Sequence, residues 1–126
     1  MAIRIMLVDD SSICNLIMQK VLSRLPIDAE IHDFTDPVLA FSQIPVLSPA
    51  VIFLDLNMPE LDGWGFLQRM KETGQTNRVI ILTSSTSAVD RGRCADFSNV
   101  VAYHTKPLMK ERILALLDTL QTELPQ

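Results

Sequence analysis

The chain has 126 residues, 48% of them hydrophobic and 21% charged, which suits one domain spanning residues 1–126 and excludes a disordered chain. Its formal net charge of −4 provides no basic surface for direct nucleic-acid binding. No apolar run is long enough to cross a membrane or to serve as a signal peptide, so we expect a cytoplasmic domain without membrane insertion.

Short apolar runs alternate with amphipathic segments along the chain, and prolines or polar caps separate them. The runs have the length and β-branched content of strands, and the segments carry apolar residues at helical spacing. The second helix is expected to begin at Pro37 and to end before Pro45. The expected strands are residues 3–8, 29–34, 51–55, 79–82 and 100–103; the expected helices are residues 12–25, 37–44, 63–73, 88–97 and a last segment around 113–120.

Five strands alternating with five helices predict an α/β fold, a parallel sheet covered on both faces. The expected arrangement is the flavodoxin-like, doubly wound (βα)5 sheet with strand order 2-1-3-4-5, which places the first and third strands side by side. Asp9, Asp10 and Asp55 end these two strands and should share one pocket. Thr83 and Lys106 end the next two strands, so all five side chains are expected on one rim of the sheet.

These five side chains indicate a particular chemistry. Three crowded carboxylates repel one another unless a cation joins them, and oxygen ligands without Cys or His favour Mg²⁺. The ammonium of Lys106 and the hydroxyl of Thr83 add the donors that a doubly charged phosphoryl group requires. Asp55 is central to the other groups and is therefore the expected nucleophile toward phosphorus. The residues predict a Mg²⁺-assisted aspartyl-phosphate site.

The same residues resemble the receiver domain of two-component response regulators, in particular stand-alone chemotaxis-type regulators. The resemblance runs from Ile3 to about Leu120 and rests on residues 7–10, 54–59, 61–63, 82–84 and 106–108. It implies that Asp55 accepts a phosphoryl group from a sensor histidine kinase or a histidine phosphotransfer protein. Output would then pass by contact to a downstream target protein.

The resemblance also implies roles for individual side chains of the site. Asp10, Asp55 and the backbone carbonyl of Asn57 would bind Mg²⁺, with Asp9 acting partly through water. Thr83 and Lys106 would contact the phosphoryl oxygens.

Further positions would serve the switch that follows phosphorylation. Thr83 would be drawn toward the phosphoryl group, and Tyr103, which matches the family's switch aromatic, would rotate inward. This movement would change the surface of the fourth helix, fifth strand and fifth helix. The Lys106–Pro107 peptide bond is expected to be cis, and Ser84 stands where the family usually has alanine or glycine, which would narrow phosphate access.

Other functions share parts of this pattern. An aspartyl-phosphate hydrolase of the haloacid dehalogenase type needs a second aspartate where this chain has Asn57, which cannot transfer a proton. A nucleotide- or flavin-binding protein is disfavoured because neither G-x-G-x-x-G nor a P-loop is present. We therefore expect no enzyme activity beyond self-catalysed phosphotransfer and autodephosphorylation. A pseudo-receiver that binds partners without phosphorylation remains the alternative.

Three smaller expectations complete the sequence analysis. Met1 lies close to the first strand, which favours a natural start over a receiver excised from a larger regulator or hybrid kinase. Trp64 is expected to be a partly exposed residue of the third helix. Cys14 and Cys94 lack metal-type spacing and are expected to be reduced and buried.

Overall fold

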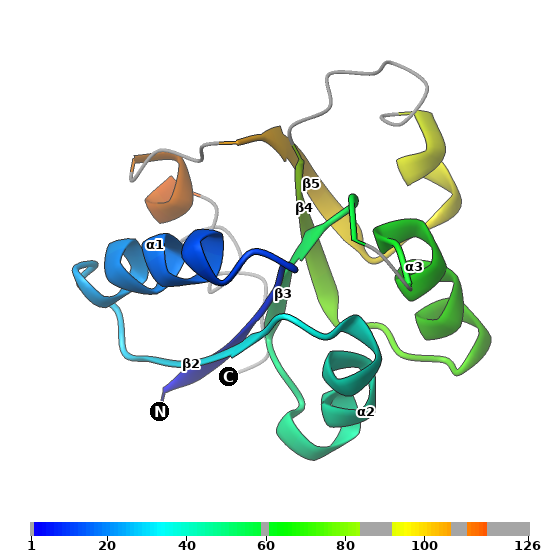
Figure 1. Ribbon diagram of the computed structural model, residues 1–126, viewed down its shortest axis with the longest axis horizontal. Coiled ribbons are helices and arrows are strands. Elements are labelled where there is room, and N and C mark those ends of the chain that lie inside the picture. Colours follow the sequence, from blue (N-terminus) through cyan, green and yellow to red (C-terminus); the bar gives the residue numbers. More distant parts are fainter. Residues whose placement is uncertain (1, 59–60, 84–91, 107–110, 116–126) are drawn as a thin grey trace.

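A computed structural model describes residues 2–58, 61–83, 92–106 and 111–115 of the chain. Within them, five strands form one parallel sheet in the order β2-β1-β3-β4-β5 (Figure 1). The strands are β1 (Ile3–Val8), β2 (Ala29–Phe34), β3 (Val51–Asp55), β4 (Arg78–Thr83) and β5 (Val100–Thr105). The predicted α/β fold and its strand order are confirmed.

Helices cover both faces of this sheet (Figure 1). The helical elements are α1 (Ser12–Ser23), α2 (Pro37–Leu47), α3 (Gly63–Glu72), the 3-10 helix η1 (Cys94–Asp96) and the helical residues 111–115. Side chains of α2 and α3 pack with one set of strand residues, while α1 and Ile113 pack with the alternate set. Among the described residues, no helix is long and apolar enough to span a bilayer.

The apolar stripe of α1 is divided between the core and the solvent. Leu22 is 1% exposed and packs against the sheet. At the other end of the helix the buried residue is Asn15, whose Nδ2 donates to the backbone carbonyls of Asp9 and Phe34, both at 3.1 Å. Three apolar side chains of the first turns are largely exposed: Ile13 (68%), Leu16 (50%) and Ile17 (56%). Polar contacts therefore help to hold the start of α1 at the end of β1.

The expected end of the second helix before Pro45 is wrong. The helix continues to Leu47, and Ser48 caps it in the left-handed conformation with φ 46°. The N–H of Ser48 donates to the carbonyl of Ile44 at 2.8 Å. Because Pro45 stands in the last turn, its missing N–H removes one backbone hydrogen bond and the capped turn persists.

The expectation of a partly exposed Trp64 is also wrong, because the side chain is only 7% exposed. Its ring stacks on Phe97 with 6.0 Å between centroids, and the guanidinium of Arg93 lies 4.4 Å from the Trp64 ring centroid. These contacts join α3 to the segment before β5. Of the helix expected over residues 88–97, residues 88–91 lie outside the described part, and the remainder includes the short η1.

Candidate functional site

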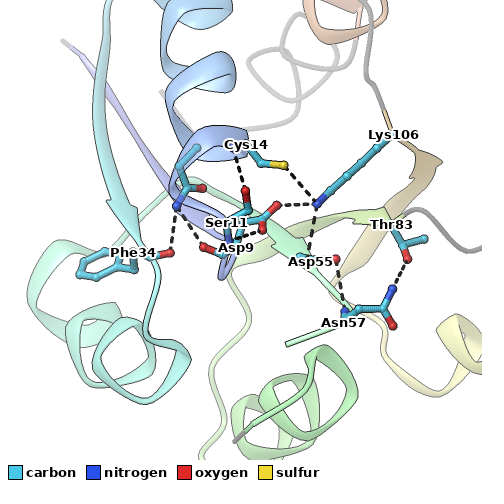
Figure 2. Close-up of polar contacts among 9 residues, drawn as sticks. Asp9, Ser11, Cys14, Phe34, Asp55, Asn57, Thr83 and Lys106 are labelled. Atoms are coloured by element: carbon cyan, nitrogen blue, oxygen red, sulfur yellow. Dashed lines mark hydrogen bonds and ion pairs between the residues drawn. The ribbon is translucent and has the colours of Figure 1, made fainter. Parts of the chain in front are cut away.

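The carboxyl ends of the strands bring the predicted side chains to one rim of the sheet, and Figure 2 shows Asp9, Asp55, Thr83 and Lys106 there. Asp9 and Asp10 follow β1, Asp55 ends the adjacent β3, and Thr83 ends β4. Lys106 follows β5, and its backbone N–H donates to the carbonyl of Thr83 at 2.8 Å. This common rim follows from parallel strands that all point the same way.

Three of these residues form a compact acidic cluster. One carboxylate oxygen from each of Asp9, Asp10 and Asp55 lies within 4.8 Å of the others. Asp9 and Asp55 are 7% and 6% exposed, whereas Asp10 is exposed. An oxygen-only cluster of this size fits a small hard cation such as Mg²⁺, which binds oxygen at about 2.0–2.1 Å and retains several waters. Asn57, the implied source of a carbonyl ligand, stands in the loop directly after β3.

Lys106 places a positive charge against this cluster. Its Nζ lies 2.5 Å from Oδ2 of Asp9 and 3.6 Å from Oδ2 of Asp55. Burial would lower the pKa of Lys106, but the hydrogen bond to Asp9 and the attraction of both carboxylates outweigh it. The pKa of Lys106 is therefore raised, and the ammonium stays charged.

The surroundings of Asp55 disfavour the charged form of its carboxylate. Burial raises the pKa of Asp55, while the charge of Lys106 and the hydrogen bond from the backbone N–H of Asn57 lower it. The nearby charges of Asp9 and Asp10 raise it again, and the net shift is upward. A cation that joins the cluster would therefore stabilise the folded protein.

Asp55→Asn should therefore stabilise the metal-free domain at neutral pH. Because the pKa of Asp55 is raised on folding, its contribution to stability is present at low pH and is lost as the pH rises through the folded pKa. The amide removes the buried charge, so we expect a gain of about 1 kcal/mol, or roughly 4 °C in Tm, at pH 7.5. Thermal unfolding between pH 4 and 7.5, in buffer containing a chelator, measures this gain.

The matched control for this experiment is Asp28→Asn, which changes an exposed carboxylate near the opposite end of β1. Its effect on Tm should be small at every pH. A gain in Asp55→Asn that does not shrink as the pH is lowered would contradict the electrostatic cause, because protonation removes the charge from the wild type too.

The predicted switch residues Thr83 and Tyr103 lie on the neighbouring strands β4 and β5. Thr83 is fully buried, and Tyr103 on β5 is partly buried and packs against the core cluster that contains α2 and α3 side chains. Ser84 and Pro107 lie outside the described residues.

Two polar contacts of the site were not foreseen from the sequence. Asn15 ties the start of α1 to the carbonyl of Asp9, as described above, and Asn57 Nδ2 donates to Oγ1 of Thr83 at 3.2 Å. A polar residue inside the apolar pattern of a helix was the available signal for Asn15. No sequence pattern indicates that the Asn57 amide contacts Thr83, because the two residues are 26 positions apart.

The chain is thus an α/β protein whose doubly wound sheet carries an acidic cluster and a lysine at the carboxyl rim, the edge where open sheets of this class bind ligands. Comparison with known proteins makes the class specific. Residues 5–118 match the response regulator receiver domain, and the chain belongs to this family, whose members serve two-component systems.

Curated relatives include two protein-glutamate methylesterases/protein-glutamine glutaminases. Methylesterase/glutaminase 2 of Shewanella denitrificans is 33% identical over 102 residues, which cover 81% of this chain and 29% of that protein. Methylesterase/glutaminase 1 of Chromobacterium violaceum is 32% identical over 117 residues, which cover 92% of this chain and 32% of that protein. The chain spans about three tenths of the length of these relatives.

Solved structures share the fold along nearly the whole chain. Chemotaxis protein CheY4 of Vibrio cholerae superposes with a TM-score of 0.83 at 21% identity, covering 95% of this chain and 99% of that one. The response regulator domain of Thermotoga maritima CheB gives 0.76 at 24% identity, covering 97% and 96%. These chains therefore share the fold of this receiver domain.

Proposed function

We propose that this chain is a phospho-receiver that accepts a phosphoryl group on Asp55 with the help of Mg²⁺. One observation carries the proposal: the buried carboxylate of Asp55 belongs to an acidic cluster suited to a cation, and its Oδ2 lies 3.6 Å from Nζ of Lys106. A nucleophile, a cation site and a fixed positive charge are the parts that phosphoryl transfer requires.

The proposed transfer uses these residues in distinct ways. An oxygen of Asp55 bonds to phosphorus as the P–N bond of a phosphohistidine donor breaks, and the imidazole leaves with the electron pair and takes up a proton. The backbone N–H of Asn57 donates to Oδ1 of Asp55 at 3.2 Å and orients the carboxylate. Lys106 would exchange Asp9 for a phosphoryl oxygen. Asp10, Asp55 and the backbone carbonyl of Asn57 would hold Mg²⁺, with Asp9 acting partly through water. The bound cation would neutralise the charge of the carboxylates and of the phosphoryl group.

The partners in this proposal are proteins. Receivers of this family act with histidine kinases and downstream effectors. For this chain we infer a sensor histidine kinase or histidine phosphotransfer protein as the donor. The output would be protein contact at the surface built from the fourth-helix region, β5 and the fifth helix, with Thr83 and Tyr103 as its switch.

The proposal includes no separate enzyme activity. Asn57 stands where an aspartyl-phosphate hydrolase of the dehalogenase type needs a proton-transferring carboxylate, so only self-catalysed phosphotransfer and slow autodephosphorylation are expected.

A cytoplasmic location also belongs to the proposal. Both cysteines are free, in keeping with a reducing compartment, although Cys14 and Cys94 are partly exposed and not buried as expected.

Incubation with acetyl phosphate and Mg²⁺, followed by intact mass measurement, tests the proposal. We expect one phosphate-sized mass gain that needs Mg²⁺ and disappears after hydroxylamine, which cleaves acyl phosphates. Acetylation of lysines by the same reagent gives a smaller mass gain and is thereby distinguished. Loss of the gain in Asp55→Asn assigns the site. No gain in the wild type with either acetyl phosphate or a phosphorylated histidine donor would favour the pseudo-receiver.

A further inference from the structure

Both donors that the proposed phosphoryl site needs are engaged by other side chains in this structure (Figure 2). Lys106 Nζ lies closer to Asp9 Oδ2, at 2.5 Å, than to Asp55 Oδ2, at 3.6 Å. The hydroxyl oxygen of Thr83 accepts a hydrogen bond from Nδ2 of Asn57 at 3.2 Å. A phosphoryl group on Asp55 would therefore have to draw both donors away from these partners.

We propose that the side chain of Asn57 is a positioning residue, which holds the Thr83 hydroxyl in its resting place and so opposes entry into the phosphorylated state. This inference rests on the proposed function of the site. It adds a role for the Asn57 amide to the role implied for its backbone carbonyl.

The location of Asn57 fits this role because the residue forms hydrogen bonds with both Asp55 and Thr83. Its backbone N–H donates to Oδ1 of Asp55 at 3.2 Å, and its side chain reaches Thr83 across to the next strand. Phosphorylation of the Asp55 carboxylate would therefore disturb the same residue whose side chain holds the Thr83 hydroxyl.

The two partners also differ in what they lose when the hydrogen bond breaks. Thr83 is fully buried, whereas Asn57 is exposed. The Asn57 amide can turn to water, but the Thr83 oxygen gives up a partner inside the protein. In this bond the Asn57 amide is the donor and the Thr83 hydroxyl oxygen is the acceptor. The amide thus restrains the position of the hydroxyl.

Beryllofluoride, which mimics a phosphoryl group, measures the effect without the turnover of a phosphate. Titration in the presence of Mg²⁺ should show Asn57→Ala binding about two- to tenfold more tightly than the wild type, since a typical hydrogen bond changes an equilibrium by this factor. Asn77→Ala is the matched control, because it removes another amide–acceptor hydrogen bond, from Asn77 Nδ2 to the carbonyl of Pro49, away from the site. Its affinity should equal that of the wild type.

A double-mutant cycle separates the side-chain contact from an indirect effect on the metal. In Thr83→Val the hydroxyl is absent, so adding Asn57→Ala should change the beryllofluoride affinity no further. An unchanged affinity in Asn57→Ala alone overturns the proposal, and so does a gain of equal size in the Thr83→Val background.

The resting protein provides a readout that does not depend on the proposed function. Without metal or beryllofluoride, the Thr83 methyl resonance should shift in Asn57→Ala and its side-chain rotamers should average, whereas Asn77→Ala leaves both unchanged. If the wild type binds no beryllofluoride, the phospho-receiver function fails. If the Thr83 methyl is identical in Asn57→Ala and wild type, the positioning role fails instead.

Discussion

Lys106→Ala is expected to change two properties of the site in opposite directions. Phosphorylation by acetyl phosphate should slow by about a hundredfold or more, because a fixed donor aimed at developing charge is a large part of transition-state stabilisation. Mg²⁺ should bind about tenfold more tightly, since a positive charge near a cation site opposes a second cation. Both effects follow from an ammonium that lies 2.5 Å from Asp9 Oδ2 and 3.6 Å from Asp55 Oδ2.

Calorimetric titration with Mg²⁺ and a time course of intact mass measure the two effects on the same preparations. Lys20→Ala, which removes an exposed lysine from the last turn of α1, should change neither. The metal-free Lys106→Ala protein should also have a lower Tm, which Mg²⁺ restores, because three carboxylates then lack their counter-charge. A parallel loss of metal binding and phosphorylation would show that Lys106 only maintains the shape of the cluster.

The fold was predictable from the sequence because its determinants are local or follow from sheet geometry. Apolar runs such as residues 51–55 are short and uniform, so their assignment as buried strands needs no tertiary information. Once the strands are parallel, Asp55 at the end of one and Thr83 at the end of another must reach the same rim. The position of Lys106 beside them follows in the same way from the end of β5.

Two features of the fold were not predicted from the sequence, for different reasons. Trp64 follows a loop and a glycine, but its ring stacks on Phe97, which lies far along the chain. The turn containing Pro45 is closed by a local left-handed cap at Ser48, a conformation that helix propensity does not describe.

Within the site, the sequence predicted which residues meet but not how they pair. Asp9, Asp55 and Lys106 could be placed on one rim, yet the preference of the ammonium for Asp9 depends on side-chain rotamers. The same is true of Asn57, whose side-chain amide donates to the Thr83 hydroxyl oxygen in addition to the role expected for its backbone carbonyl. These pairings determine the resting state, and the proposed switch must break them.

Gly63→Ala is expected to destabilise the domain by about 3 kcal/mol and to lower Tm by roughly 10 °C. An added Cβ would stand 2.7 Å from Cα of Leu56 and 2.8 Å from the carbonyl oxygen of Asp55. These are backbone atoms, so no change of rotamer can relieve the contact. The loop from Asp55 to the start of α3 must move instead, and the hydrogen bond from the N–H of Gly63 to the carbonyl of Leu56, at 3.0 Å, holds it in place.

Urea unfolding of Gly63→Ala beside Gly92→Ala separates this close contact from a general effect of replacing glycine. Apart from its chain neighbours and the local helix backbone, no described residue has an atom within 4 Å of the Cβ that would be added at Gly92, so that change should be neutral or slightly stabilising. Equal unfolding midpoints for the two variants would contradict the steric argument. The carbonyl oxygen of Asp55 is among the crowded atoms, so movement of the loop also displaces the proposed nucleophile and its Asn57 contact. Folded Gly63→Ala should therefore be phosphorylated more slowly than Gly92→Ala at a temperature where both are native.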